Sequence, residues 1–344
     1  MKPAILILFL ISVMQSQSQK SKKDSLNAAI IQYRESVNRA AQQFMSRSLG
    51  AEQRLKAIEP YSTLYDQQQV NGFKKIVIDQ EERPEIRATA LNRIYQYVPG
   101  DQQLQILTMN WLGDQKTAKP LRREALHLSG TLFFTDMRIP QVYQQLLDDP
   151  DIEFRVFAFN RLVTNGDARA QQKLIDGLLN PASAQLPPPT AIGILSLALK
   201  KEYYPAVYKV LQETKDEPTR LEAIRALGSY TEARPRLISI SRDANEKDAF
   251  REAALGALYA GDKENIVSYA TPILNDNKAT PRLQIIAIQM TIDVRQNMSY
   301  RVNTKKADDY DKLIKSISEG KGFNKSGELL QVANKYIQTV RPKF

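Results

Sequence analysis

The side chains that most often perform catalysis or bind metals are scarce in this sequence. His127 is the only histidine among 344 residues, and there is no cysteine. Zinc and copper sites with histidine or thiolate ligands, and Ser-His-Asp or Cys-His nucleophilic arrangements, therefore lack essential groups. The sequence predicts no metal site, no cofactor and no catalytic residue.

Two pairs of adjacent carboxylates remain as groups that could act as general acid and base. Asp148 and Asp149 form one pair, and Asp308 and Asp309 form the other. Such groups would support the alternative function, a carboxylate-dependent hydrolase or lyase on an α/α helical scaffold. Because both pairs fall in expected turns or caps, capping of backbone N–H groups is the simpler interpretation.

Most of the chain consists of a repeated sequence phrase centred on an arginine, and the helices that this phrase predicts would have to position any site. The copies lie at Arg87, Arg123, Arg155, Arg220, Arg251 and Arg282, with spacings of 36, 32, 65, 31 and 31 residues. The spacing of 65 covers two periods, so we expect Thr190 at the arginine position of an intervening unit and Arg54 in an irregular first unit. Self-similarity at such a period is typical of stacked repeat proteins.

The residues after each arginine predict an amphipathic helix. The third position holds Ala90, Leu126, Ala158, Ala223, Ala254 and Ile285, and the fourth holds Leu91, His127, Phe159, Ile224, Leu255 and Ile286. Together with apolar residues at the seventh position, this is the spacing of one buried helix face. We therefore expect His127 to be a packed core residue.

Recurrent signals divide each unit into two helices. Three Gly-Asp pairs are expected to end one helix with a left-handed glycine and to cap the next with the aspartate: Gly100-Asp101, Gly166-Asp167 and Gly261-Asp262. Three further pairs place a polar cap before a proline at the first helical position: Asp149-Pro150, Glu217-Pro218 and Thr280-Pro281. The chain is therefore expected to be all-α.

The phrase resembles the HEAT repeat family, including the HEAT-like units of phycobilisome lyases, over about residues 81–293. In that family an acid precedes the arginine by six residues, as in Asp149 with Arg155, Asp276 with Arg282 and approximately Glu81 with Arg87. Arg123, Arg220 and Arg251 lack that acid, so the acid–arginine ladder of the family is interrupted in these three units. The resemblance implies an α-solenoid with a right-handed superhelix, built from about eight stacked HEAT-like pairs with helical caps. Members usually act as binding scaffolds.

We interpret the repeated arginines as structural. The guanidinium offers five donors in a flat fork, so one side chain can tie its own turn to the next while its stem covers apolar surface.

The two ends of the chain differ from the array between them. Residues 1–18 have a basic start, an apolar run and the small residues Ser16 and Ser18, which together predict a cleaved signal peptide. We expect an N-terminal cap with an irregular first unit at 19–80, the array at 81–296 and a C-terminal cap at 297–344. The mature chain is then exported, periplasmic or extracellular in a bacterium, with no membrane span. Its basic ends could contact anionic surfaces, and nucleic acid is not expected because it conflicts with export.

Aromatic residues recur twelve positions before the arginine position. Trp111, Tyr143 and Tyr208 occupy it in three units. One hypothesis makes them a strip of rings that binds a protein or peptide partner, since amphipathic rings are good interface anchors. The alternative places them at the edge of the core. The expected function is a non-catalytic scaffold.

Overall fold

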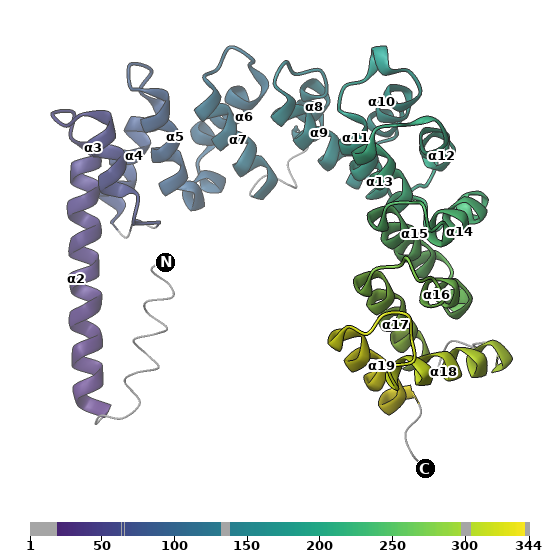
Figure 1. Ribbon diagram of the computed structural model, residues 1–344. Coiled ribbons are helices and arrows are strands. Elements are labelled where there is room, and N and C mark those ends of the chain that lie inside the picture. The colour runs from purple at the N-terminus through teal and green to yellow at the C-terminus, as the bar shows by residue number, and fades with distance from the viewer. Residues whose placement is uncertain (1–18, 63, 65, 132–137, 297–303, 341–344) are drawn as a thin grey trace. The chain divides into compact units, whose positions relative to one another are not determined.

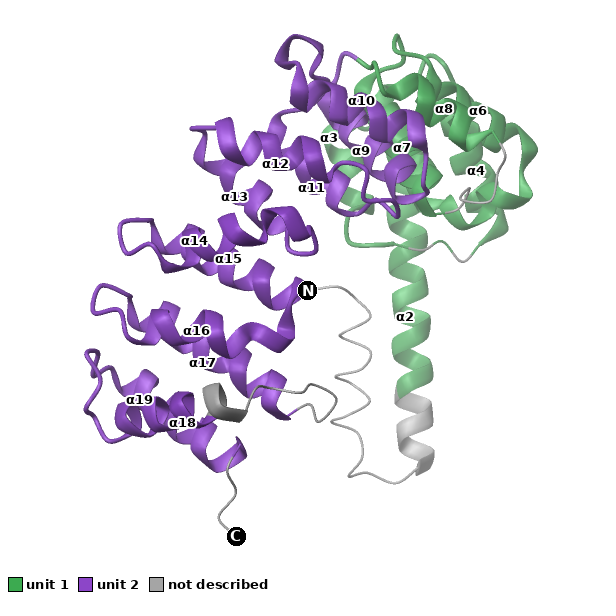
Figure 2. Cartoon of the chain, turned by 90° about the vertical axis from the view of Figure 1, so that its right-hand side faces the viewer, with its two compact units in different colours: residues 1–149 green, residues 150–344 purple. Residues whose placement is uncertain are grey.

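The computed structural model describes residues 19–62, 64, 66–131, 138–296 and 304–340. Within these ranges the chain forms helices joined by turns, with no strand, so the all-α prediction is confirmed. The predicted signal peptide at 1–18 lies outside the described residues. The chain divides into two compact units, residues 1–149 and 150–344, which are coloured separately in Figure 2. None of the described helices has the length and apolar character needed to cross a membrane.

In the first unit, helices that follow one another in the chain pack as pairs. The elements are α2 (Gln19–Met45), α3 (Ala51–Ile58), α4 (Gln67–Ile78), α5 (Pro84–Arg93), the 3-10 helix η2 (Tyr95–Gly100), α6 (Gln102–Gly113), α7 (Lys119–Thr131) and α8 (Ile139–Leu146). α2 packs on α3, α4 on α5 and α6 on α7 (Figure 1). Contacts between alternate helices place α2, α4, α6 and α8 in one layer and α3, α5 and α7 in the other.

The second unit repeats this arrangement. Its elements are α9 (Ile152–Thr164), α10 (Ala168–Leu179), η3 (Pro181–Ser183), α11 (Pro188–Ser196), α12 (Tyr204–Glu213), α13 (Glu217–Ala226), η4 (Thr231–Ala233), α14 (Arg234–Arg242), α15 (Asp248–Gly261), η5 (Lys263–Asn265), α16 (Ile266–Leu274), α17 (Pro281–Gln296), α18 (Thr304–Ser318) and α19 (Gly327–Val340). Helices α9, α11, α13, α15 and α17 form one layer by successive contacts. Helix α19 packs against α17 and α18 at the end of the unit.

The predicted buried face forms the core between the two layers. Residues at the third and fourth positions after the arginine are completely buried in α5, α9, α13 and α15: Ala90, Leu91, Ala158, Phe159, Ala223, Ile224, Ala254 and Leu255. The small residue at the third position lets the neighbouring helix approach, and the larger residue beside it fills the space between layers.

The helix ends follow the predicted signals only in part. Asp101 and Asp167 cap α6 and α10 and accept backbone N–H hydrogen bonds of 3.1 and 2.8 Å. The cap of α9 is Asp151 instead of Asp149. Of the three predicted left-handed glycines, only Gly166 has a positive φ, of 83°. Gly261 is the last residue of α15, and glycine is needed there because the backbone oxygen of Gly228 lies too close for a Cβ.

Candidate functional site

An arginine recurs as the fourth residue of α3, α5 and α7 in the first unit and of α9, α13 and α15 in the second unit. These residues are Arg54, Arg87, Arg122, Arg155, Arg220 and Arg251. In α3, α5 and α15 its Nε donates to the backbone carbonyl ten residues earlier, at 2.7, 3.0 and 3.3 Å. Those carbonyls lie in the last turn of the preceding helix, where they lack intrahelical donors and where the helix dipole favours a cation. The arginine therefore joins the two helices of a pair.

The same guanidinium reaches an acid in the turn that joins the two helices of the next pair. Arg54 bonds Glu82 at 2.8 Å and Arg251 bonds Asp276 at 2.6 Å. Arg122 pairs with Asp149, which is almost completely buried. These contacts connect one helix pair with the turn inside the next pair, and they are buried enough to be sensitive to loss of either partner.

In three of the sequence repeats, the structure places a different residue at the buried fourth position than the sequence predicted. Arg122 occupies the buried position in α7, whereas Arg123 is exposed. The fourth residue of α11 is Ala191, one position after Thr190. In α17 the buried fourth residue is Gln284, and Arg282 is an exposed residue paired with Glu252 at 2.9 Å. The turns before α11 (residues 180–187) and α17 (residues 275–280) are longer than the turns before α5, α7 and α9, and α7 contains two adjacent arginines, so the sequence phrase does not begin every helix at the same point.

The prediction that His127 is a core residue is wrong for the same reason. His127 is exposed on α7, and Leu126 and Ala125 occupy the inward positions. A shift of one residue rotates a side chain by about 100° around a helix, which is enough to move it from the buried face to solvent.

The two pairs of carboxylates have different surroundings in the structure. Asp149 is committed to Arg122, and Asp308 and Asp309 are exposed, with Asp309 3.4 Å from Lys312. The described residues contain no group of three or more His, Cys, Asp or Glu side chains able to hold a metal ion.

Two of the three aromatic candidates belong to the packed interior. Trp111 is 5% exposed and lies beneath the Arg87 guanidinium, whose carbon is 5.1 Å from the ring centroid. Tyr143 is also buried, and its hydroxyl donates to Ser129 at 3.0 Å. Because both rings are buried, they fit the alternative that places these aromatic residues at the edge of the core, and neither is exposed to anchor a partner. Tyr208 is partly exposed, 5.9 Å from the ring of Tyr230.

The different burial of Trp111 and Tyr208 predicts different losses of stability when each ring is replaced by serine. Trp111→Ser should lower the free energy of unfolding by about 2–4 kcal/mol, because it removes packed contacts and a cation–π contact. Tyr208→Ser, the matched control, should cost about 1 kcal/mol or less because its ring is partly solvated. Urea titrations followed by circular dichroism measure both values. An unchanged stability of Trp111→Ser would show that this ring is not part of the core.

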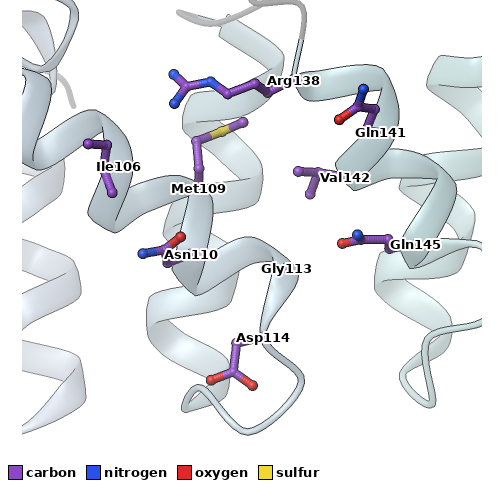
Figure 3. Close-up of a pocket in the computed structure, with 9 residues that line it drawn as sticks. All are labelled: Ile106, Met109, Asn110, Gly113, Asp114, Arg138, Gln141, Val142 and Gln145. Carbon is purple, nitrogen blue, oxygen red and sulfur yellow. The ribbon is translucent and has the colours of Figure 1, made fainter.

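An open groove lies between α6 and α8 in the first unit (Figure 3). It is lined by Ile106, Met109, Asn110, Gly113, Asp114, Arg138, Gln141, Val142 and Gln145. On both helices these residues follow the spacing i, i+3, i+4 and i+7, so each helix contributes one continuous edge. Val142 and Gln145 extend from α8 towards α6, and Arg138 reaches over the end of the groove near Met109 (Figure 3).

The groove combines apolar and uncommitted polar groups. Met109 is nearly buried and Ile106 is 44% exposed, so apolar surface is available along α6. Within the described part of the chain, the side-chain amides of Asn110, Gln141 and Gln145 make no hydrogen bond. The sequence did not predict this site, because amide and apolar residues at helical spacing are common on helix surfaces.

A partly buried carboxylate on α7 is the clearest titratable group in the first unit. Glu124 accepts a 2.9 Å hydrogen bond from the Asn92 side chain of α5. Burial raises the pKa of Glu124 above its ordinary value, although the Asn92 hydrogen bond and the Coulombic interactions with His127 and Arg93 oppose that shift. Ionisation of Glu124 therefore opposes folding.

We expect Glu124→Gln to stabilise the protein at neutral pH. Because the folded pKa lies above the unfolded value, wild-type stability from this group is present at low pH and is lost as pH rises through the folded pKa. Glutamine cannot ionise and retains an oxygen that accepts from Asn92. Melting temperatures from pH 4 to 8 should show a gain that disappears at the acid end. Glu85→Gln, at an exposed carboxylate, should show no such trend. A gain independent of pH would contradict this account.

No protein-family model matches the chain, and no curated protein sequence matches it. The inference of function therefore depends on the residues and geometry of the chain itself.

Proposed function

We propose that this chain is an exported α-solenoid of HEAT-like helix pairs that binds a protein or peptide partner and performs no catalysis. The repeated arginine, the pairwise packing and the two helix layers within each unit support the repeat architecture. Each such pair buries its apolar face against its neighbours, which leaves the edges between successive helices of one layer available for ligands.

The α6–α8 groove is the single observation that carries the binding function. A groove with apolar surface and exposed side-chain amides can supply both apolar contacts and hydrogen bonds to a polypeptide. The residues concerned sit on two helices whose positions are fixed by packing, so the groove is preformed.

Site-specific photo-crosslinking tests this proposal. The full mature chain would carry benzoylphenylalanine at Gln141 in the groove or, as a control, at Gln212, an exposed glutamine of α12. In envelope extract of the producing bacterium, Gln141 should give a discrete protein adduct and Gln212 should not. Absence of an adduct from Gln141, Gln145, Asn110 and Tyr208 alike would contradict the scaffold function.

Export is tested separately from binding. We expect mass spectrometry of the protein isolated from the producing cells to show Gln19 as the first residue, because Ser16 and Ser18 supply the small residues before the cleaved bond. A mature chain that still begins at Met1 would contradict cleavage and return the apolar segment to the role of an anchor.

A further inference from the structure

The apolar face of α2 continues beyond the helices that cover it. Val37 and Phe44 are completely buried where α2 packs on α3 and α4 (Figure 1). Leu26 and Ile30 precede Val37 at helical spacing, which places them on the same side of α2. They are 37% and 42% exposed. The face that forms the core of the first unit at one part of α2 is therefore open to solvent nearer its start.

The exposed part of α2 carries apolar surface on more than one side. Every residue from Leu26 to Gln32 is exposed. Ile31 is 58% exposed and lies about 100° around the helix from Ile30. No charged residue occurs between Asp24 and Arg34 in the sequence. Three large apolar side chains exposed within two turns of one helix indicate a contact surface, because isolated surface residues do not cluster in this way.

Lysines adjoin this apolar segment on its N-terminal side. The start of α2 contains Lys20, Lys22 and Lys23 against one acid, Asp24. At 1.5 Å per residue, all three positions lie within about 10 Å of Leu26 along the helix axis. A basic cluster beside exposed apolar side chains on one helix is the combination that binds in the plane of an anionic bilayer surface.

A second copy of the chain fits this segment less well than a bilayer does. Residues 26–33 cover about 11 Å of helix. A stable protein interface buries about 1,200 Å² or more in total, which two such short segments cannot supply. A bilayer has no such requirement, because each apolar side chain that enters it contributes separately, and its negative charge complements the lysines.

We propose that α2 binds the surface of an anionic phospholipid bilayer, with Leu26, Ile30 and Ile31 in the boundary between headgroups and acyl chains. The positive charge of the preceding lysines attracts the lipid phosphates. The helix lies along the surface and does not cross it. This contact holds the mature chain at a membrane through residues other than those of the α6–α8 groove.

Vesicle flotation with the full mature chain tests the proposal. Vesicles of equal parts phosphatidylcholine and phosphatidylglycerol should carry the protein, and vesicles of phosphatidylcholine alone should bind it at least about tenfold less, because they lack net negative charge. Ile30→Ser with Ile31→Ser should weaken binding to the anionic vesicles about tenfold. The melting temperature should not change, since both side chains are exposed.

Leu199→Ser is the matched control for the isoleucine substitutions. Leu199 is 74% exposed and belongs to the second unit. This variant should bind anionic vesicles like wild type. Equal binding of wild type and the double isoleucine variant would overturn the proposal.

The role of the lysines has a control at the other basic end of the chain. Lys20→Gln, Lys22→Gln and Lys23→Gln together should weaken binding to anionic vesicles at least about tenfold, because each cation near the surface contributes several-fold. The control removes the same charge from exposed lysines in and after α18 and should bind like wild type. Its substitutions are Lys312→Gln, Lys315→Gln and Lys321→Gln. Equal losses from both triple variants would show attraction by net charge alone and would overturn the role of α2.

The absence of cysteine from the sequence allows one environment-sensitive label to be placed at a chosen residue. Ile31→Cys labelled with nitrobenzoxadiazole should show blue-shifted emission when anionic vesicles are added, because the label moves from water into the bilayer interface. Leu199→Cys with the same label should show no shift. A shift at neither position, or equal shifts at both, would overturn the assignment of the contact to α2.

Sedimentation velocity and photo-crosslinking separate this inference from its alternatives. Without lipid, Ile30→Ser with Ile31→Ser should leave the sedimentation coefficient unchanged, and a dimer that these substitutions dissociate would assign the segment to a second copy and overturn the proposal. Crosslinking at Gln141 reports on the groove and not on α2. Vesicle binding without a crosslinked partner would support the membrane contact and contradict the scaffold function, and a crosslinked partner without vesicle binding would do the reverse.

Discussion

Replacement of Arg251 by methionine should lower the free energy of unfolding by about 3–5 kcal/mol, the cost of breaking a buried ion pair from one side. The Arg251 side chain is 1% exposed and bonds Asp276 at 2.6 Å and the Ser241 carbonyl at 3.3 Å. Methionine fills much of the same volume but has no donor. The carboxylate and the carbonyl at the end of α14 would then lose the cation that holds α14, α15 and the turn before α17 together.

Arg282→Met is the matched control for this change. Arg282 also pairs with an acid, Glu252, but its side chain is 79% exposed. Surface ion pairs contribute about 0–1 kcal/mol, so we expect a change within about 0.5 kcal/mol. Urea titrations of both variants, followed by circular dichroism, give the comparison. Equal losses would show that burial does not distinguish the two arginines, and that the repeat register described above is incorrect.

Gly261→Ala should destabilise the second unit by at least about 4 kcal/mol, at the far end of the effects seen for overpacking. A Cβ on Gly261 would lie 1.7 Å from the backbone oxygen of Gly228, and a Cβ on Gly228 would lie 2.5 Å from the oxygen of Ala257. Both conflicts are with backbone atoms, so no change of rotamer relieves them. The ends of α13 and α15 would have to separate.

Gly256→Ala controls for the general effect of adding a methyl group to α15. The nearest atom to a Cβ at that position is the Met290 Cε at 3.9 Å, an ordinary contact. Alanine in a helix interior is favoured over glycine by about 0.5–1 kcal/mol, so this variant should be neutral or slightly more stable. Thermal melts decide the matter. A Gly261→Ala protein that melts with the wild type would mean that the helix ends are not in this close contact.

Burial also decides which side chains could bind a partner. Trp111 and Tyr143 are the most prominent aromatic residues of the repeated helices, yet both are buried and serve packing. The groove between α6 and α8 instead presents glutamine and asparagine, which are unremarkable in a sequence because such residues cover most helix surfaces. Their importance depends on which faces of two separate helices meet.

The sequence by itself determined the all-α class, the pairs of helices and most of the buried face. Helical periodicity is a local property, so Ala223 with Ile224 and Ala254 with Leu255 could be assigned to the core from spacing alone. The caps at Asp101 and Asp167 are equally local, because the side chain bonds an N–H within three residues of its own position.

Only the tertiary structure decided which residue of each sequence repeat is buried at the arginine position, whether the aromatic residues are buried, and where the groove lies. The sequence of α7 contains two adjacent arginines, and Arg122 is the buried one because α7 begins at Lys119 and Arg122 is therefore its fourth residue. Each residue of slip rotates the helix face by about 100°, so an error of one position exchanged His127 for Leu126 in the core. Gly261 looked like a helix stop, but the constraint on it comes from the Gly228 carbonyl, which is 33 residues away in the sequence and in contact only after α13 and α15 have packed.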